Sequence, residues 1–541
     1  MQNFNNIILF GGETKNENMP VGFYSSLALL PLRGKPLIWW QLNNLKEQGL
    51  NSFIVVVCKE NTKLIKYIKN ILFETFNITL VTINRNKNIL SSLKYGLMKA
   101  NLNIPTRVIL GDTFLDESIS EEKDILYTSK NFTISDNWCL VEKSKDTINF
   151  YDKQNNLDTK NKEALVGYYA FSDTKTLLDC CIKSRLFLKK EISTAIIEYQ
   201  KKHLLELKLV NDWVDLGHTS GLIKVKNKLF NARDFNSIQV NTDIGILTKK
   251  SIKIQKLEDE AYWFNTIPDD LKILSPRFIS FSKNKDYAEL SQELYGYPTL
   301  QELYLSGEVN LEDWSCIIEK LFNLHKNFEK YTIKNQTNSL NWLYYDKTFE
   351  RIEQAKEQNN YWKKLFEREI EYINEKKFRG LKLLEKELKN KAKSISNKNN
   401  LAIMHGDYCF SNILFDSSNY IFKLIDPRGR LNENATIYGD NRYDIAKLRH
   451  SICGLYDFIV HKMFKLNETN SGFEYKILLT KDYSVLEKIF DDFAEKNGFI
   501  VNDIKFIEGL LFLSMIPLHK DDINRQKMFY IRAIELLNNT L

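Results

Sequence analysis

Apolar and amphipathic segments alternate through the first 110 residues of the chain. Continuous apolar runs occupy 7–10, 53–57, 79–83 and 107–110, and helical patterns occupy 36–49, 62–73 and 89–100. Continuously apolar strands separated by helices are typical of a parallel sheet that is covered on both faces. The pattern therefore predicts an α/β fold at the N-terminus, a doubly wound Rossmann-like domain. Ligands of such sheets bind at the carboxyl ends of the strands.

The bulk properties indicate a multidomain globular protein. A chain of 541 residues is too long to fold around a single hydrophobic core, and 43% of its residues are apolar. The net charge of +7 is spread over interleaved acidic and basic residues, which predicts no nucleic-acid binding. No apolar run reaches the length of a membrane span, so we expect no membrane insertion. The seven scattered cysteines indicate reduced thiols and a cytoplasmic protein.

A segment in the second half carries the residue types that phosphoryl transfer requires. The tripeptide His-Gly-Asp at 405–407 is followed by Asn412 and, after an apolar strand, by Asp426. One carboxylate can accept the proton of an attacking hydroxyl, while the amide and the other carboxylate can hold Mg²⁺ against nucleotide phosphates. A tight turn between two buried strands would explain the glycine but not the register of Asn412 and Asp426.

This spacing resembles the H-G-D-x-x-x-x-N segment of the aminoglycoside phosphotransferase and choline kinase families, which are related to the protein kinases. The resemblance implies a bilobal, kinase-like α+β domain that uses ATP and Mg²⁺. It also implies that Asp407 is the catalytic base, that Asn412 and Asp426 bind the metal, and that His405 braces the loop.

A β-hairpin is predicted for 233–251, and a helix that carries Glu260 follows it. A strand lysine paired with a helical glutamate positions ATP phosphates in kinase-like folds, and we predict Lys249 with Glu260 for this pair. Lys250 would point to the opposite face of the strand. Two further lysines are alternatives, Lys253 and Lys256. An ordinary surface lysine is also compatible with the pattern.

Other segments extend the resemblance to these kinases. The strand around Glu293 is similar to the hinge strand that binds adenine, which makes this segment a candidate nucleotide contact. Arg428 is expected either to contact the acceptor or a phosphate, or to form a salt bridge. Asp444 is expected to bind the backbone of the catalytic loop. The charged helical pattern of 310–400 predicts amphipathic helices of a larger lobe.

The region 1–225 resembles the sugar-1-phosphate and phosphocholine nucleotidyltransferases, and the resemblance implies that the Rossmann-like domain is of the GT-A type. The matching segments are 29–38, 111–112, 151–153, 167–171 and 213–217. The resemblance implies that Asp112 and Asp215 bind Mg²⁺ between an attacking phosphate and the α-phosphate of CTP, GTP or UTP. It also implies that Lys153 contacts the substrate phosphate. The loop that would hold the triphosphate contains Gly11, Gly12 and Lys15.

The chain departs from the nucleotidyltransferase pattern at two positions. Lys15 stands where the family has arginine, and Leu27-Ala28 stands where it has lysine. Arginine and lysine are not interchangeable at a bidentate phosphate contact. Either an active transferase or an inactive, nucleotide-binding domain therefore fits the sequence. Asp112 could also cap a following helix, and Lys153 could be a solvated side chain.

We expect a nucleotidyltransferase-like domain at 1–228 and a kinase-like phosphotransferase domain at 229–541, with a small lobe to about 300 and a helical lobe beyond. The predicted protein is a bifunctional enzyme. It phosphorylates a small alcohol or sugar with ATP and activates the product with a nucleoside triphosphate, releasing pyrophosphate. The resemblance to both families implies a role in capsule or lipopolysaccharide biosynthesis.

Three alternatives accompany this prediction. The protein could be a kinase with an inactive N-terminal domain, a binding protein without catalysis, or a glycosyltransferase. A glycosyltransferase would need an Asp-x-Asp motif after the fourth strand, and the chain instead has Asp112-Thr-Phe-Leu-Asp116. The sequence specifies neither the phosphoryl acceptor nor the oligomeric state.

Overall fold

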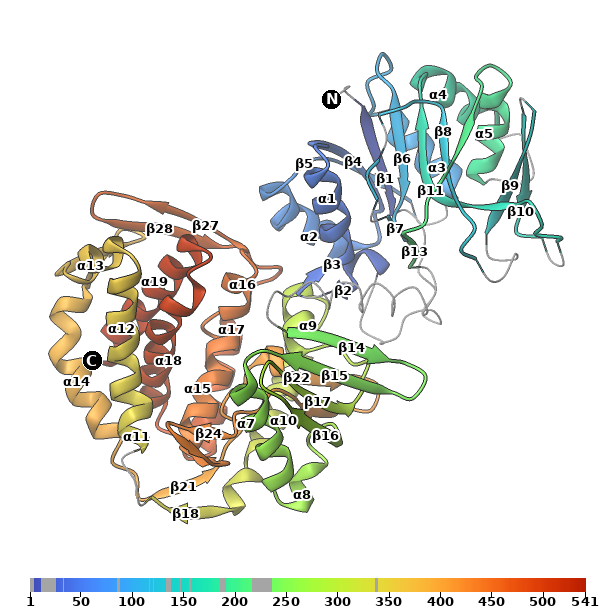
Figure 1. The fold of residues 1–541 in the computed structure, drawn as a ribbon. Coiled ribbons are helices and arrows are strands. Elements are labelled where there is room, and N and C mark those ends of the chain that lie inside the picture. The colour runs from blue at the N-terminus through green and yellow to red at the C-terminus, as the bar shows by residue number, and fades with distance from the viewer. Residues whose placement is uncertain are drawn as a thin grey trace. The chain divides into compact units, whose positions relative to one another are not determined.

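The computed structural model divides the chain into two compact units, Met1–Leu229 and Phe230–Leu541 (Figure 1). It describes residues 4–10, 26–32, 34–84, 88–115, 117–119, 121–132, 138–145, 147–154, 157–184, 191–216, 236–335 and 339–541. The protein is of the mixed α/β class, as predicted. Within the described residues, no helix is long and apolar enough to cross a membrane.

A nine-stranded sheet forms the centre of the first unit. Its main path runs β10-β9-β11-β6-β1-β4-β5, and β8 joins β12 to β11. The strands are β1 (Asn5–Phe10), β4 (Ser52–Cys58), β5 (Asn77–Ile83), β6 (Thr106–Leu110), β8 (Ile125–Ser129), β9 (Cys139–Ser144), β10 (Thr147–Asp152), β11 (Glu163–Phe171) and β12 (Glu206–Leu209). Two small antiparallel pairs accompany the sheet, β2 (Pro31–Leu32) with β3 (Lys35–Pro36), and β7 (Thr113–Leu115) with β13 (Trp213–Asp215).

The sheet is mixed: its first half is parallel, and in its second half β12 pairs with β8 in parallel while β8, β9, β10 and β11 form antiparallel pairs. Strands β6, β1, β4 and β5 pair in parallel, as their apolar runs predict. The parallel prediction rested on the strands up to residue 110, and beyond them β11 pairs with β6, β8 and β9 in antiparallel register. The physical reason is the connection. β9 and β10 form a hairpin, which reverses the chain without a crossover helix.

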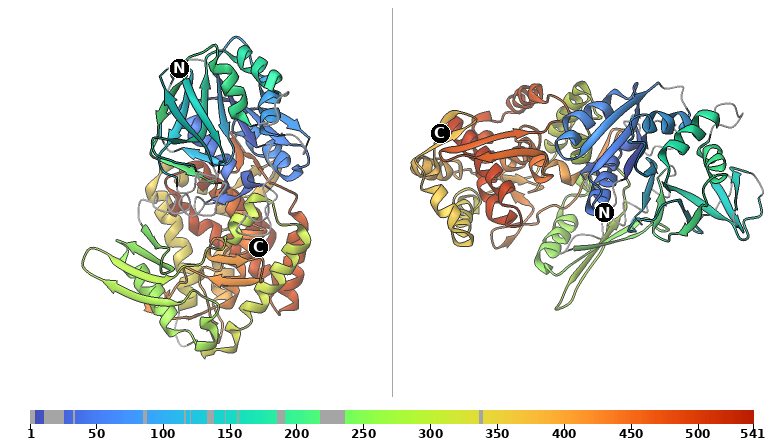
Figure 2. Two further views of the ribbon diagram at one scale, coloured as in Figure 1. Left: turned by 90° about the vertical axis from the view of Figure 1, so that its right-hand side faces the viewer. Right: turned by 90° about the horizontal axis from the view of Figure 1, so that it is seen from above.

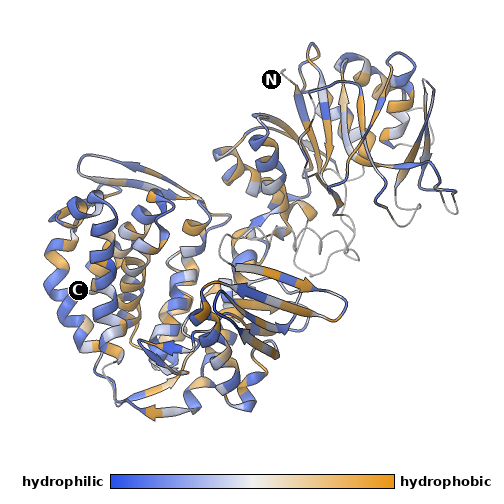
Figure 3. Ribbon diagram, in the orientation of Figure 1, coloured by the Kyte–Doolittle hydropathy of each residue, from blue (hydrophilic) through white to orange (hydrophobic). Residues whose placement is uncertain are grey.

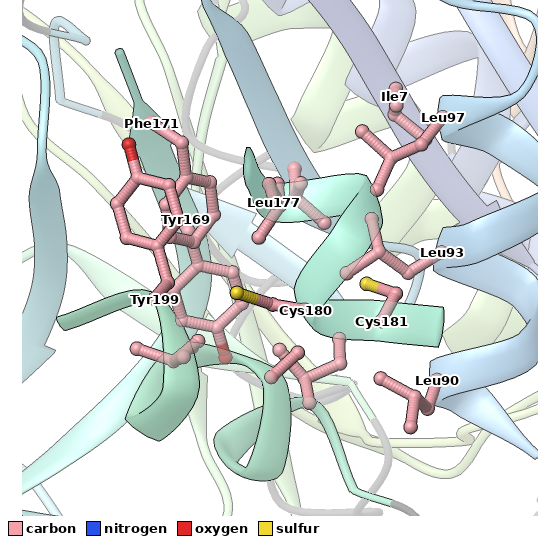
Figure 4. Packing of buried hydrophobic residues seen from close by; sticks show 14 of the residues in the cluster. Ile7, Leu90, Leu93, Leu97, Tyr169, Phe171, Leu177, Cys180, Cys181 and Tyr199 are labelled. Atoms are coloured by element: carbon pink, nitrogen blue, oxygen red, sulfur yellow. The ribbon is translucent and has the colours of Figure 1, made fainter. Parts of the chain in front are cut away.

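Helices α3, α4 and α5 cover one face of this sheet (Figures 1 and 2). Alternate residues of β1 and β4 pack against them, because strand side chains alternate between the two faces. Figure 4 shows leucines of α3 opposite Leu177 and Cys181 of α4. Burying each such side chain contributes roughly 1.5–3 kcal/mol. The helices of this unit are α1 (Leu37–Glu47), α2 (Thr62–Asn70), α3 (Ile89–Leu97), α4 (Thr174–Lys183) and α5 (Ile192–Gln200).

The second unit begins with a small lobe. A four-stranded antiparallel sheet runs in the order β14-β15-β17-β16, and the first two strands form the predicted hairpin. Helix α7 packs against β16 and β17. The elements are β14 (Asn236–Asn241), β15 (Ile246–Ser251), α7 (Ile254–Thr266), α8 (Asp269–Lys272), β16 (Phe278–Lys283) and β17 (Ala288–Glu293).

The larger lobe of this unit is mainly helical. Helix α18 is buried around most of its circumference and packs against α12, α15 and α19. Helix α14 buries Leu381, Leu384 and Leu388 while Leu383 is exposed, and its ribbon carries both hydrophilic and hydrophobic bands (Figure 3). The helices are α9 (Leu300–Ser306), α10 (Leu311–His325), α11 (Ser339–Asn341), a π-helical turn (Trp342–Asp346), α12 (Lys347–Gln358), α13 (Asn360–Phe366), α14 (Leu381–Ile395), α15 (Asn441–Ile452), α16 (Tyr456–Val460), α17 (Ser484–Lys496), α18 (Val501–Met515) and α19 (Ile523–Thr540).

Short strands connect these helices and carry the segment with the His-Gly-Asp tripeptide. The hairpin β22–β23 follows that tripeptide, and β21 precedes it. The strands are β18 (Thr332–Lys334), β19 (Ile370–Ile373), β20 (Lys376–Arg379), β21 (Asn400–Ile403), β22 (Ile413–Asp416), β23 (Ile421–Leu424), β24 (Arg430–Leu431), β25 (Asn434–Ala435), β26 (Tyr438–Gly439), β27 (Phe464–Glu468) and β28 (Gly472–Ile477).

Candidate active sites

The loop after β21 is held by a buried carboxylate from α15. The two oxygens of Asp444 accept hydrogen bonds from the backbone N–H groups of His405, at 2.7 Å, and Gly406, at 2.8 Å. Gly406 adopts φ = +77°, and a Cβ atom there would lie 2.7 Å from Cβ of Arg428. Only glycine meets both constraints without strain. The loop backbone is therefore fixed before any ligand binds.

His405 supports the loop from within the core. Its side chain is fully buried and packs edge-on against Trp263, with ring centroids 5.8 Å apart. Its Nδ1 atom accepts a hydrogen bond from the N–H of Asp407 at 3.3 Å. Burial lowers the pKa of His405, although nearby carboxylates oppose the shift, so the ring is neutral and can accept this bond. His405 thus acts on the conformation of the loop.

Asp407 lies beside Asn412 and a lysine of α15. The Asn412 side-chain amide donates to the Asp407 backbone oxygen at 2.9 Å and to its Oδ2 atom at 3.1 Å. The Lys447 ammonium lies 2.9 Å from Oδ1 of Asp407. Burial alone would raise the pKa of Asp407, but Lys447 and Arg428 outweigh it and lower that pKa. The carboxylate is therefore ionised and can accept a hydrogen bond from a hydroxyl.

Lys249 joins the small lobe to the other predicted metal ligand. Its ammonium lies 2.5 Å from Oε1 of Glu260 in α7 and also contacts Oδ1 of Asp426. Glu260 is 2% exposed, so the pair is buried. Lys250 lies on the opposite face of β15 and pairs with Glu289 at 3.1 Å. The strand alternation that favoured Lys249 in the sequence thus corresponds to the observed geometry.

The hairpin β22–β23 brings Asp426 close to Asn412. The N–H of Ile425 donates to the Asn412 carbonyl at 2.9 Å, just before Asp426, which adopts φ = +56°. Amide and carboxylate oxygens are the ligands that Mg²⁺ prefers, and such sites are completed by nucleotide phosphates. The described residues contain no cluster of three or more His, Cys, Asp or Glu side chains arranged for a metal. Magnesium held largely by phosphates does not require one.

Glu293 lies at the end of β17, with its side chain exposed. The N–H of Glu293 donates to the carbonyl of Arg277 at 2.9 Å, and that of Leu294 donates to Gly245 at 2.8 Å. These two N–H groups are therefore engaged in the sheet and are not available to an adenine ring. The Glu293 carboxylate accepts a hydrogen bond from Tyr295 at 3.2 Å.

Sequence reasoning predicted the contact of Asp444 with the loop backbone but missed Lys447. Asp444 and Lys447 are three positions apart in α15 and so lie on the same helix face, which borders the loop that carries Asp407. That spacing was the available signal. Arg428, predicted to bind a phosphate or form a salt bridge, lies 4.0 Å from Oδ1 of Asp407 and is 44% exposed.

The first unit places its two predicted metal carboxylates on adjacent backbone segments. Asp215 ends β13 and pairs with Thr113 of β7, while the N–H of Leu216 donates to the carbonyl of Asp112 at 2.7 Å. Asp112 follows β6, at the carboxyl edge of the sheet. A strand follows Asp112, so the alternative that it caps a helix was wrong. Asp112 and Asp215 are 103 positions apart in the chain, and only β13 brings them together.

Three polar side chains fix this carboxyl edge. The buried Gln41 amide of α1 donates to the carbonyls of Gly111, at 3.1 Å, and Thr113, at 2.6 Å. The Trp213 indole N–H donates to Oγ1 of Thr113 at 2.9 Å. The Trp138 indole N–H donates to Oδ2 of Asp215 at 2.8 Å. These bonds orient the backbone on both sides of Asp112 and one oxygen of Asp215.

Lys153 follows β10 and shares a neighbour with Asp215. Its backbone N–H donates to the carbonyl of Trp138 at 3.3 Å, and the indole of the same tryptophan contacts Asp215. Lys153, through its backbone, and Asp215, through its side chain, therefore both contact Trp138. The predicted triphosphate contacts Gly11, Gly12 and Lys15 lie outside the described residues.

No protein-family model matches the chain, and no curated protein matches it. Solved structures do match its N-terminal part. One is a UDP-glucose pyrophosphorylase complexed with UDP-glucose, with 16% identity over 43% of this chain and 100% of that chain, at a TM-score of 0.37. Another is a CTP:phosphocholine cytidylyltransferase from Streptococcus pneumoniae, with 19% identity over 42% of this chain and 100% of that chain, at a TM-score of 0.34. At these scores the similarity assigns no activity to the chain.

Proposed function

We propose that the second unit is a kinase-like phosphotransferase that transfers the γ-phosphoryl group of ATP to a small alcohol or sugar. The observation that carries this proposal is the arrangement around Lys249. This lysine contacts Glu260 and Asp426 at once, 166 positions apart in the chain, while Asn412 contacts Asp407 beside them. A lysine–glutamate pair, a base and two oxygen ligands form the set of groups that phosphoryl transfer uses.

Each residue of this site has a role in the proposed reaction. Asp407 accepts the proton of the acceptor hydroxyl as its oxygen bonds to the γ-phosphorus, and the bond from that phosphorus to ADP breaks. Lys249, held by Glu260, binds the nucleotide phosphates. Asn412 and Asp426 would hold Mg²⁺, which neutralises charge on those phosphates when it is bound. His405 maintains the loop that carries Asp407.

We further propose that the first unit is a nucleotidyltransferase that couples the phosphorylated product to CTP, GTP or UTP and releases pyrophosphate. The support is the pair Asp112 and Asp215, which adjacent backbone segments present at the carboxyl edge of the sheet. Together with Mg²⁺ these carboxylates would clamp an attacking phosphate and the α-phosphate of the nucleotide. A cytoplasmic enzyme with both activities would supply activated building blocks for capsule or lipopolysaccharide synthesis.

One observation favours a second candidate, a kinase whose first unit binds nucleotide without catalysis. Ala28, near the position of the family's lysine, is fully buried and belongs to a short 3₁₀ turn. That position offers no cation to a phosphate. The two candidate functions therefore differ in whether another cation, such as Lys153, binds the phosphate that the family's lysine would bind.

Phosphorus NMR of the whole chain with Mg²⁺, the four common nucleoside triphosphates and pooled alcohols and sugars tests both proposals. The kinase predicts a new phosphomonoester that disappears in Asp407→Asn. The transferase predicts a pyrophosphate diester and free pyrophosphate, both lost in Asp112→Asn while the monoester persists. A monoester that accumulates alone with all four nucleotides would favour the second candidate. A monoester that persists in Asp407→Asn would contradict the assignment of the base.

A further inference from the structure

Four cationic side chains lie in the neighbourhood of Asp407, and three of them act on a buried tyrosine. The tyrosine is Tyr443 of α15, which is 3% exposed. The cations come from three parts of the larger lobe: α12, the loop after Asp426, and α15. They are Lys347, Arg351, Arg428 and Lys447. We call these four side chains the cationic cluster.

Direct contacts connect the cluster to Tyr443 and to Asp407. The Lys347 ammonium lies 3.1 Å from the Tyr443 hydroxyl oxygen and 5.2 Å from the centre of its ring. The charge of Arg428 also acts on Tyr443. Burial raises the pKa of Tyr443, but Lys347, Arg428 and Lys447 outweigh it and bring that pKa to about 8. A phenol with a lowered pKa reports a positive local potential.

The positive charge of the cluster has few partners. Among the described residues, Asp407 is the one carboxylate within 4.0 Å of any of the four cations, and it contacts Lys447 and Arg428. Arg351 donates instead to the neutral side chain of Gln354 at 2.7 Å, and the exposed Glu350 is its neighbour in sequence. Lys347 donates to the Tyr443 hydroxyl, and its ammonium also lies 5.8 Å from the centre of the Trp342 ring. Burial lowers the pKa of Lys347, and the charge of Arg428 lowers it further.

The cluster combines the buried Lys447 with the half-exposed Arg428, and its net positive charge favours the binding of an anion beside Asp407. The cluster belongs to the larger lobe and lies beside the proposed base, Asp407. Lys249 and Glu260, in contrast, belong to the small lobe. In the proposed reaction Lys249 binds the nucleotide phosphates, so the cationic cluster is available to bind a different anion. A cationic alcohol would be repelled at the same place.

We propose that the phosphoryl acceptor is an alcohol that already carries a phosphate or carboxylate group, and that Lys347, Arg351 and Arg428 bind this anion while the hydroxyl meets Asp407. The inference rests on the proposed kinase function and names its substrate class. The new phosphoester forms at the hydroxyl, and the anionic group keeps its bonds. The same geometry excludes amino alcohols and quaternary ammonium alcohols as preferred acceptors.

A matched set of three-carbon alcohols tests the substrate class on the whole chain with Mg²⁺ and ATP. The set is D-glycerate, glycerol 3-phosphate, glycerol and 2-amino-1,3-propanediol. We expect the better anion to exceed the neutral and cationic alcohols in kcat/KM by roughly ten- to a hundredfold, the range for one charge-assisted contact. A preference for glycerol or for the amine would overturn the inference while leaving the kinase intact.

Lys347→Gln separates the acceptor site from the nucleotide site. We expect this variant to raise the KM of the anionic acceptor about tenfold and to leave the KM of ATP within about twofold. Lys356→Gln is the control, because Lys356 lies in the same helix and pairs only with Glu353 on the surface. An increase in the KM of ATP instead of the acceptor would show that the cluster binds nucleotide, which contradicts the inference.

A binding measurement decides the inference even if none of the four alcohols reacts. Inorganic phosphate is titrated calorimetrically into the chain saturated with Mg²⁺ and a non-hydrolysable ATP analogue. The inference predicts binding that weakens at least about fivefold in Lys347→Gln and is unchanged in Lys356→Gln. No binding, or equal binding to both variants, overturns it. Failure of the kinase is judged separately, by the absence of any Asp407-dependent phosphomonoester.

Discussion

The ammonium of Lys447 lies 2.9 Å from the Oδ1 atom of Asp407. Helix α15 brings it there by the same face that presents Asp444 to the loop backbone. One helix therefore fixes both the conformation of the loop and the charge of its carboxylate.

Replacing Lys447 by methionine should impair the proposed phosphoryl transfer more than substrate binding. The lysine is 6% exposed on its side chain, so methionine fills the space but removes the charge beside Asp407. We expect kcat to fall about 100-fold or more, with the KM of ATP changed less than about threefold. Lys447→Arg is the control and should recover most of the rate. Equal losses in both variants would mean that packing, not charge, is what matters.

Replacing Lys249 by methionine should destabilise the second unit. The change leaves the buried carboxylate of Glu260 and the partly exposed carboxylate of Asp426 without the ammonium that both contact. Breaking a buried ion pair from one side costs roughly 3–5 kcal/mol. Chemical unfolding measures this loss, and adding Glu260→Gln should restore part of it. Lys250→Met is the matched control on the same strand, since its pair with Glu289 is 36% exposed on both sides. A comparable loss in the control would contradict the prediction.

Replacing Asp457 by asparagine should stabilise the protein at high pH. Asp457 is fully buried, and its Oδ1 atom accepts a hydrogen bond from Gln301 at 2.6 Å. Burial raises its pKa to about 7, although hydrogen bonds from Gln301 and Ser451 oppose this shift. A raised pKa means that the protonated form is favoured in the folded state. Its contribution to stability is therefore present at low pH and is lost as the pH rises through about 7.

Urea unfolding of wild type and Asp457→Asn at pH 5 and pH 8 tests this expectation. The asparagine keeps the hydrogen bond from Gln301 and does not ionise. We expect its advantage in the free energy of unfolding to be larger at pH 8 than at pH 5 by roughly 2–3 kcal/mol. An advantage that does not change with pH would show that Asp457 does not titrate in this range.

Replacing Gly429 by alanine should destabilise the packing between the loop after Asp426 and helix α7. A Cβ atom at Gly429 would lie 1.8 Å from the backbone oxygen of Asp259, and backbone cannot move aside as a side chain can. We expect a loss of roughly 1–3 kcal/mol, the usual cost of overpacking. Gly296→Ala is the control, because no heavy atom lies within 4 Å of its Cβ position. Thermal unfolding of both variants provides the comparison.

The parts of the fold that local patterns determine could be predicted from the sequence. The apolar runs of β1, β4, β5 and β6 specify buried parallel strands, and the hairpin β14–β15 follows from its turn and alternation. The antiparallel direction of β11 could not be predicted, because it depends on pairing with strands that are distant in the chain. The pattern of apolar residues in a buried strand is the same in either direction.

In the candidate sites too, residues specified by a local pattern could be predicted, and residues placed by contacts between distant segments could not. Lys249 was selected over Lys250 by the two-residue period of a strand, and the structure places it beside Glu260. Lys447 was missed because its contact with Asp407 joins segments 40 positions apart and depends on how α15 packs. The strand after Asp112 was also missed, since β7 has only three residues and forms by pairing with β13. Short strands have little pattern of their own.

The position of β13 in the chain determines when the second carboxylate, Asp215, is synthesised relative to the strands of the sheet. Every strand of the nine-stranded sheet, including β12, precedes β13 in the chain. Asp215 is the last residue of β13, so a fragment cut between Leu209 and Trp213 retains the whole sheet and Asp112 but lacks the second carboxylate. During translation, the scaffold is complete before the proposed metal pair exists. An assay of secondary structure would not distinguish such a fragment from a unit that contains both carboxylates.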